Sequence, residues 1–296
     1  MKNIFLAVLI LVFSVLLFYL FIKPSEFEVN LKARTVPGDV IETIRIWNRS
    51  LNEAHIVEVD SFNSVSQTIV WKTRRYNYKW KFINLNDSLT HVNVQISEPG
   101  RTFINKFLVP FTDQNIEKDA EEIVTAFYEV LKTHLKITKV KVIGEVEMDS
   151  SFCVCRRFET DQLDKANGMM RDYPLLTSFI NDFGLKLDGP PIVKVLQWDH
   201  NNGLLKFDFC FPIIKADSLP TVEGLVYLKI EKTKALKAEY YGNYITSDRA
   251  WYALVQYADE NGYKTDRLPI EYFYDNPNLG MNEIKWKAEV YLSIYK

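Results

Sequence analysis

The sequence lacks the motifs that mark most metal and nucleotide sites. Its four histidines are scattered, and none has a second histidine three to five residues away: His55, His91, His134 and His200. Because zinc sites usually combine histidines or cysteines at such close spacings, no metal site is expected. The sequence also has no glycine-rich phosphate loop and no Gly-x-Ser-x-Gly nucleophile motif. We therefore expect neither a metal nor an organic cofactor.

Cysteine is scarce as well, with only Cys153, Cys155 and Cys210. Cys153 and Cys155 lie two residues apart, so in a strand both point to one face, in a geometry that disfavours a mutual disulfide. The odd count and this spacing predict no disulfide framework. Since no histidine lies near them in the sequence, we interpret the three as buried strand residues rather than nucleophiles or ligands.

Glycine and proline number only 11 each, and neither sign of charge dominates. The low glycine and proline content excludes collagen-like and low-complexity chains. The net charge of −2 and the pI near 6.2 argue against a nucleic-acid-binding protein, whose affinity comes from neutralising many phosphates. What the 296-residue chain has instead is 47% hydrophobic and 14% aromatic residues, enough for packed cores in about two domains.

The longest apolar run lies at the amino terminus, Ile4–Ile22, with Lys2 before it and Lys23 after it. As a helix it would span roughly 28 Å, close to the hydrocarbon thickness of a bilayer. A cleaved signal peptide usually has a shorter apolar run and a small-residue cleavage site, which this segment lacks. The pattern predicts an uncleaved transmembrane anchor over residues 1–23 and a single-pass membrane protein. The flanking charges do not decide its orientation.

Residues 24–147 begin with short segments separated by turn signals. The segments are rich in Val, Ile, Thr and aromatic residues, which favours strands: Phe27–Ala33, His55–Val59, Ser66–Lys72, Tyr76–Leu85, Thr90–Ser97 and Arg101–Phe107. Apolar residues then recur at helical spacing from Ile116 to Leu135, which predicts a helix over about 113–135. A meander followed by one long helix is an α+β arrangement.

This arrangement resembles the START-like superfamily (SRPBCC, polyketide cyclase-like), in which a curved sheet grips a C-terminal helix. The stretch "ARTVPGDVIETIRIWN" is similar to the first strand and helix of that superfamily. The resemblance implies a START-like helix-grip domain over residues 24–147 that holds an apolar ligand between sheet and helix. The alternative is a domain whose aromatic side chains only fill a core: Trp71, Tyr76, Tyr78, Trp80 and Phe82.

An internal repeat occupies the rest of the chain. At an offset of 78 residues the sequence aligns with itself, and identical residues fall at these pairs of positions: Gly184/Gly262, Lys186/Lys264, Asp188/Asp266, Pro191/Pro269 and Ile192/Ile270. Two copies of a strand, a helix and a two-stranded hairpin explain the pattern. The first copy is expected as Ser151–Phe158, a helix with Pro174 near its first turn and Gly184 at its end, Pro191–Trp198 and Leu204–Ile213. The second is expected as Ala235–Tyr241, a helix over about 246–260, Pro269–Tyr274 and Trp286–Ile294.

The second copy resembles the GyrI-like small-molecule-binding family, which also supplies the effector-binding domains of AraC- and MerR-type regulators. The resemblance rests on "EYYGNYITSDRAWYALVQYADENGY", "LPIEYFYDNP" and "WKAEVYLSI", and in the first copy on "GPPIVKVLQWD" and "KFDFCFPI". It implies a GyrI-like domain over residues 148–296, in which an aromatic-lined ligand cleft lies between two modules. It also implies one central acid, which falls here on Glu271. Ser293 departs from the family, which commonly has a proline in the closing strand.

The repeat itself singles out Glu271, because the equivalent position in the first copy is Val193. Strand alternation predicts that Glu271 and Phe273 share one face. A carboxylate beside aromatic rings in a partly dry cleft favours cationic or donor-rich aromatic ligands. The candidate ligand-binding residues are therefore Glu271, Trp251, Tyr244, Tyr241 and Phe273. The alternatives are a solvated Glu271 and aromatic residues that only join a helix to a sheet.

The leading prediction is a membrane-anchored protein that binds a bulky hydrophobic, cationic or aromatic small molecule. It has no evident helix-turn-helix, so no direct contact with nucleic acid is expected. One alternative is a hydrolase of reactive electrophilic compounds, an activity known in some GyrI-like proteins, with Glu271 and Tyr244 as acid–base groups. Another is a structural or partner-binding membrane protein in which side chains fill the cleft.

Overall fold

The structure is a computed structural model. It describes residues 2–19, 25–86, 88–109, 111–112, 114–277, 280 and 282–295. The chain divides into two compact units, the first unit, Met1–Lys132, and the second unit, Thr133–Lys296.

The amino-terminal helix α1 is shorter than the apolar run predicts. It extends over Lys2–Leu17, and its 16 residues span roughly 24 Å, less than the ~30 Å of a bilayer core. No helix among the described residues is long and apolar enough to cross a membrane. The predicted transmembrane anchor over residues 1–23 and the single-pass membrane localisation are therefore wrong. The membrane as a partner has no support. Residues 1 and 20–23 of that segment lie outside the described residues.

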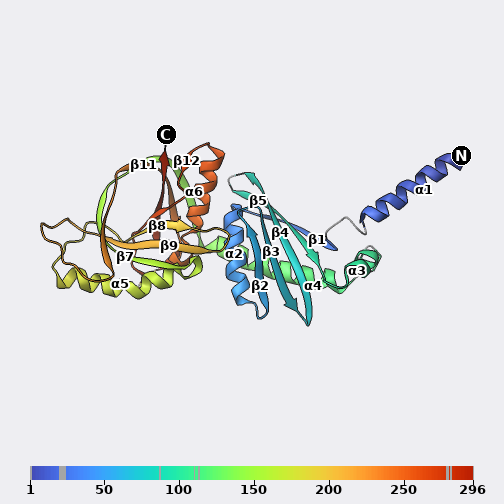
Figure 1. Cartoon of the computed structure of the whole chain (residues 1–296), viewed down its shortest axis with the longest axis horizontal. Helices are drawn as coiled ribbons and strands as arrows, with labels where there is room; N and C mark the ends of the chain where they lie inside the picture. Colours follow the sequence, from blue (N-terminus) through green and yellow to red (C-terminus); the bar gives the residue numbers. More distant parts are fainter. Residues whose placement is uncertain are drawn as a thin grey trace. The chain divides into compact units, whose positions relative to one another are not determined.

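The first unit contains an antiparallel five-stranded sheet in the order β1-β5-β4-β3-β2 (Figure 1). Its elements have these bounds: β1 Phe27–Ala33, α2 Pro37–Ser50, β2 Ala54–Asp60, β3 Ser64–Trp71, β4 Arg74–Asn86, β5 Leu89–Ser97, α3 Thr102–Leu108 and α4 Asn115–Ile137. Five of the six predicted strands are present. The sixth, Arg101–Phe107, is wrong because this segment forms the helix α3. Its apolar side chains suit either structure, and such short runs are ambiguous in sequence.

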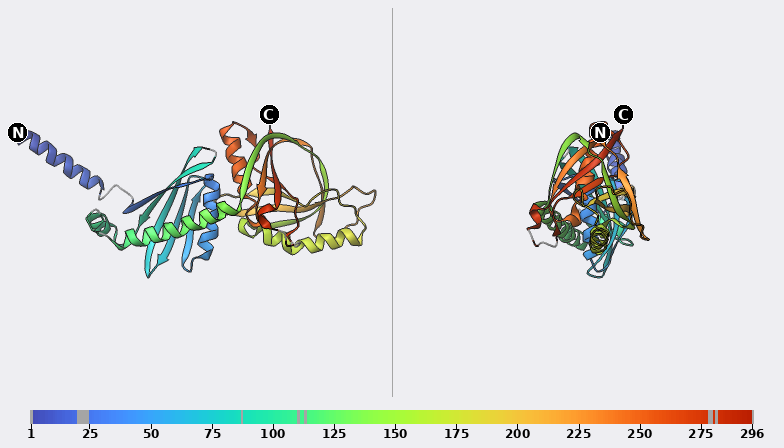
Figure 2. Two further views of the ribbon diagram at one scale, coloured as in Figure 1. Left: turned by 180° about the vertical axis from the view of Figure 1, so that it is seen from behind. Right: turned by 90° about the vertical axis from the view of Figure 1, so that its left-hand side faces the viewer.

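Helix α4 closes the core of the first unit. It runs across the strands of the sheet, as Figure 2 shows, and buries the side chains that the helical spacing predicts, Phe127 among them. The ring of Phe127 lies 4.8 Å from that of Trp80 and 5.5 Å from that of Trp47, measured between centroids. The Tyr76 hydroxyl donates to Asp119 Oδ2 at 2.6 Å. Ring packing and the buried Tyr76–Asp119 hydrogen bond thus join the sheet to the helix.

The second unit is built on a larger antiparallel sheet in the order β10-β7-β9-β8-β13-β14-β11-β6, with β12 beside β14. Its strands are β6 Lys139–Met148, β7 Ser151–Asp161, β8 Ile192–Trp198, β9 Leu204–Pro212, β10 Leu225–Ile230, β11 Thr233–Tyr241, β12 Lys264–Thr265, β13 Ile270–Phe273 and β14 Lys287–Tyr295. Its helices are η2 Gln162–Asp164, α5 Lys165–Asp182, η3 Tyr244–Thr246, α6 Arg249–Glu260 and η5 Glu283–Lys285. Helix α5 packs on β7 and β9, and α6 on β6, β11 and β14. The α+β class with antiparallel sheets therefore holds.

The two predicted copies are present as β7-α5-β8-β9 and β11-α6-β13-β14. They meet at the centre of the sheet, where β8 and β13 pair antiparallel and Val193 lies directly opposite Glu271. These two positions are equivalent in the repeat, so a pseudo-two-fold axis passes between them. Helix α5 begins at Lys165, well before the start that Pro174 suggests. Strands β6 and β10, which extend the sheet beyond each copy, are not predicted from the sequence.

The predicted absence of disulfides is wrong. Antiparallel pairing places Cys155 on β7 directly opposite Cys210 on β9, and the two form a disulfide. Cys153 is buried and free. The spacing of Cys153 and Cys155 disfavours only their mutual bridge, whereas cysteines on different strands become neighbours through the pairing of the sheet.

The face of β13 and β14 that turns away from α5 and α6 carries one heavily hydrogen-bonded carboxylate. Glu289 Oε1 accepts from Lys237 and Lys287 at 2.8 Å each, and Glu289 Oε2 accepts from the hydroxyls of Tyr274 and Tyr291 at 2.8 Å each. Burial opposes ionisation, but these four donors lower the pKa of Glu289 to about 2. Glu289 is therefore a fixed anion within this cluster.

Acid is expected to weaken the wild-type protein more steeply than the Glu289→Gln variant. The pKa of Glu289 in the folded protein lies below the unfolded value of about 4.3. Its stabilising contribution is therefore complete above that value and is lost as the pH falls towards 2. Urea denaturation at several pH values between about 5 and 2.5 measures the slope of the free energy of unfolding. Equal slopes in the two proteins would contradict the assignment.

Candidate functional site

The candidate site lies where the two modules of the second unit meet, on the sheet face that α5 and α6 cover. Glu271 on β13 has no exposed surface. Phe273 shares its face and is also buried, while Tyr272 points to the opposite face, as strand alternation predicts. Glu271 is therefore not the solvated strand residue of the alternative interpretation.

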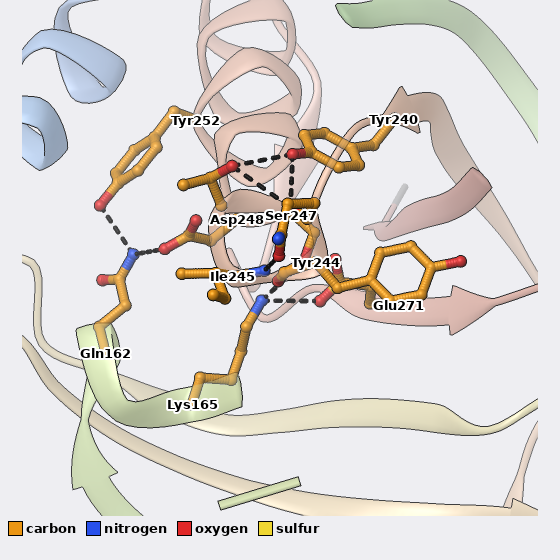
Figure 3. Close-up of polar contacts among 11 residues, drawn as sticks. Gln162, Lys165, Tyr240, Tyr244, Ile245, Ser247, Asp248, Tyr252 and Glu271 are labelled. Carbon is orange, nitrogen blue, oxygen red and sulfur yellow. Dashed lines mark hydrogen bonds and ion pairs between the residues drawn. The ribbon is translucent and has the colours of Figure 1, made fainter. Parts of the chain in front are cut away.

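A lysine from the first module neutralises this acid (Figure 3). Lys165, the first residue of α5, places Nζ 3.0 Å from Glu271 Oε2, and their side chains are 1% and 0% exposed. The same Nζ donates to Ser247 Oγ at 3.0 Å and lies 4.4 Å from the centroid of the Trp251 ring. The ammonium group is thus held by a carboxylate, a hydroxyl and the face of an indole.

The local folds that deliver Lys165 and Ser247 are alike. Asp161 and Asn243 each accept a hydrogen bond from the backbone N–H two residues later, and each begins a short 3₁₀ helix that leads to the main helix of its module. Lys165 follows the first of these turns and Ser247 the second. The two positions therefore correspond, as Val193 and Glu271 do, and the Lys165–Glu271 pair crosses the pseudo-two-fold axis.

The site retains unsatisfied polar atoms. Among the described residues, neither Glu271 Oε1 nor Trp251 Nε1 has a hydrogen-bond partner, although both are buried. Burial raises the pKa of Glu271, and the charge of Lys165 opposes that rise. A buried acceptor without a donor costs about 1–3 kcal/mol. This part of the structure is therefore not optimised for stability alone.

A hydrogen-bonded group beside Lys165 fixes the aromatic wall of the site. Gln162 Nε2 donates to Asp248 Oδ2 at 2.5 Å and to the Tyr252 hydroxyl at 2.9 Å. Gln162 Oε1 accepts from Trp198 Nε1 at 2.7 Å, and the Trp198 ring packs edge-on against Trp251 at 5.3 Å. The orientation of Trp251 thus depends on both modules.

The other predicted site residues divide between the two faces of the sheet. Tyr244 packs on Phe273 at 4.8 Å, but its hydroxyl donates to the Lys287 carbonyl at 2.7 Å and accepts from the Asp275 N–H at 3.0 Å. Tyr241 pairs with Lys287 on the face opposite Glu271. The buried Tyr240, one residue earlier, shares the face of Glu271.

Lys165, Ser247 and Gln162 are absent from the sequence-based set of site residues. Lys165 lies in a stretch that the repeat alignment does not cover, and its neighbours carry no motif. The Asp and Asn caps before each 3₁₀ helix are the signal that aligns Lys165 with Ser247, at an offset of 82 rather than 78 residues. That change of offset hides the correspondence from a single sliding comparison.

Glu271 is not among the residues that line the surface cavities found in the described part of the chain. A surface cavity of about 420 Å³ in the second unit lies beside the C-terminal end of α5 and includes Phe183, Lys186, Ile214 and Lys215 in its lining. The space next to Glu271 is filled by Lys165. A ligand at Glu271 therefore requires a rearrangement of side chains.

Comparison with known proteins identifies part of the second unit. Residues 179–294 match the family described as GyrI-like small molecule binding domain. No curated protein matches the sequence significantly. The resemblance to the GyrI-like family is thereby confirmed for these residues. The START-like assignment of residues 24–147 stays a prediction.

Several solved structures are similar to this chain. The EcmrR C-terminal domain is 17% identical, with 54% of this chain and 98% of that chain covered and a TM-score of 0.45. EcmrR in a complex with DNA is 14% identical, with 65% and 76% covered and a TM-score of 0.45. SAV2435 bound to tetraphenylphosphonium is 12% identical, with 52% and 94% covered and a TM-score of 0.39. From its sequence match, the chain carries a GyrI-like small-molecule-binding domain at residues 179–294.

Proposed function

We propose that the second unit binds a bulky hydrophobic small molecule that carries a positive charge, with Glu271 as the central acid and Trp251 as the aromatic wall. The observation that carries this proposal is the Lys165 ammonium, which lies between the Glu271 carboxylate and the Trp251 ring without exposure to solvent. The site already holds one cation in this way, so its geometry suits another of similar charge.

The energetics favour a cation over a neutral apolar ligand. Removing a carboxylate from water is costly unless a positive charge or strong donors compensate. A neutral apolar molecule that displaced Lys165 would leave the Glu271 charge buried and alone. A cation would keep Glu271 neutralised and gain about 0.5–2 kcal/mol from the Trp251 ring. Glu271 Oε1, which has no partner among the described residues, offers a further acceptor.

Two alternatives remain as hypotheses with less support. Hydrolysis of electrophiles would use Glu271 with Tyr244, but the Tyr244 hydroxyl is engaged with backbone groups. Burial raises the pKa of this hydroxyl, so it stays protonated and is a poor proton donor. In a structural protein Lys165 would fill the site permanently. The structural alternative predicts no affinity for lipophilic cations, which separates it from the proposal.

The Glu271→Gln variant is expected to bind lipophilic cations about 10–100-fold more weakly than the wild type, because the amide removes the negative charge and keeps the shape. Isothermal titration of the full chain with tetraphenylphosphonium measures this, and 10-fold corresponds to about 1.4 kcal/mol. Glu223→Gln, a change of an exposed acid, is the control and should leave Kd unchanged. An unchanged Kd in Glu271→Gln would remove the proposed role of the acid.

For the first unit we propose a START-like domain whose interior is a packed core. The support is the sheet crossed by α4 and the ring contacts among Trp47, Trp80 and Phe127. One feature favours the ligand-holding alternative: the buried Tyr78 hydroxyl has no hydrogen-bond partner among the described residues. The ring contacts outweigh it, because they occupy the space between sheet and helix.

A further inference from the structure

The ammonium of Lys165 stands where the proposed function places the charge of a ligand. It is bound by the same two groups, the Glu271 carboxylate at 3.0 Å and the Trp251 ring at 4.4 Å. Lys165 and a ligand cation therefore cannot occupy the site together. We infer, on the basis of the proposed function, that Lys165 is an internal competitor that a ligand must displace, and that it thereby sets the affinity and selectivity of the site.

The position of Lys165 in the fold permits this displacement. It is the first residue of α5, and its backbone N–H donates to the Gln162 carbonyl of the preceding 3₁₀ helix. The side chain can therefore leave the site by rotation about its own bonds, without a change in the backbone. Its side chain reaches the site through a flexible four-carbon stem. Besides its contact with Glu271, the ammonium group donates a hydrogen bond to Ser247 Oγ. The Ser247 hydroxyl in turn donates to the Tyr244 carbonyl.

The exchange also predicts which cations succeed. Glu271 faces one positive charge before and after the exchange, so the electrostatic terms largely cancel. What differs is hydration, because a lysine ammonium is a compact and strongly hydrated charge that gains water when it leaves. A large organic cation with a spread charge loses little hydration on entering and buries apolar surface in addition. The site should therefore accept tetraphenylphosphonium and reject methylammonium.

Removing Lys165 tests the inference directly. The Lys165→Met variant of the full chain is expected to bind tetraphenylphosphonium at least about 10-fold more tightly than the wild type in isothermal titration. The control, Lys141→Met, changes an exposed lysine of the same unit and should leave Kd unchanged. Methylammonium at millimolar concentration should not compete in the wild type. Equal or weaker binding by Lys165→Met would overturn the inference.

The two proposals can fail separately. If Glu271→Gln weakens binding but Lys165→Met does not strengthen it, the proposed function stands and Lys165 is only structural. If tetraphenylphosphonium binds neither the wild type nor Lys165→Met, both are overturned.

A second measurement uses the wild-type protein, in which the site is intact. The rate of acetylation of Lys165, followed by mass spectrometry, should rise at least about 10-fold when tetraphenylphosphonium saturates the protein. The rate at Lys141 should stay constant, and continued protection of Lys165 in the saturated protein would overturn the inference.

Discussion

Replacing Lys165 with methionine is expected to lower the free energy of unfolding by about 3–5 kcal/mol, because it leaves the fully buried Glu271 carboxylate without its counter-charge. The double variant Lys165→Met with Glu271→Met should lose far less free energy of unfolding than Lys165→Met alone, since apolar side chains of similar volume require no desolvation of charge. Such a replacement of a buried ion pair often stabilises a protein, by about 1–4 kcal/mol. Urea denaturation of the wild type, both single variants and the double variant completes the thermodynamic cycle.

The loss in Lys165→Met should depend on pH. Burial already raises the pKa of Glu271, and removal of the lysine charge raises it further. A carboxyl group whose folded pKa exceeds its unfolded value of about 4.3 destabilises the fold progressively as the pH rises through the folded pKa. The deficit relative to the wild type should therefore be small near pH 4 and complete at high pH. Additive losses in the double variant, or a deficit independent of pH, would show that Lys165 and Glu271 are not coupled.

A stable double variant would indicate that the ion pair serves function rather than stability. Buried ion pairs are seldom the most stable arrangement for a core, and the Lys165–Glu271 pair leaves Glu271 Oε1 without a partner among the described residues. Such local departures from the rules of packing and polar satisfaction are expected at functional sites. The pair breaks the symmetry of the two modules at their axis, where Val193 and Glu271 face each other, which is where a single ligand can contact both halves.

Much of the architecture could be predicted because the local spacing of apolar residues determines it. Alternation of apolar residues marks most strands of both units, and helical spacing marks α4 and α6. The repeat then predicts two similar modules and identifies Glu271 as the position at which they differ. These inferences need only the sequence spacing and the preference of apolar side chains for one face.

The remaining features depend on contacts between distant segments. The Cys155–Cys210 disulfide requires the pairing of β7 with β9, and Lys165 reaches Glu271 across 106 positions of sequence. The predicted set includes Tyr241, whereas Tyr240 shares the face of Glu271. The register of β11 against β14 is not visible in one strand, and a shift of one residue exchanges the faces. The amino-terminal helix shows a further limit, since an apolar run does not fix where its helix ends.

In the first unit the largest expected effect is that of Phe127→Ala, which should lower the free energy of unfolding by about 3–5 kcal/mol. Phe127 has no exposed surface and packs against the rings of Trp80 and Trp47, so its removal leaves a cavity that neighbouring rings cannot fill. Chemical denaturation followed by tryptophan fluorescence measures the loss. Tyr128→Ala, a change at the exposed next residue of the same helix, should cost below about 1 kcal/mol.

The same variant decides between a packed core and a ligand cavity. An apolar cavity made by truncation stays dry and binds small apolar molecules such as benzene, so benzene should restore part of the stability lost in Phe127→Ala and leave the wild type unaffected. If Phe127→Ala cost less than about 1 kcal/mol, or if benzene stabilised the wild type equally, space for a ligand would already exist beside Phe127. The buried Tyr78 hydroxyl would then mark the polar end of that space, and Tyr78→Phe would weaken the stabilisation by polar aromatic ligands such as phenol while leaving that by benzene intact.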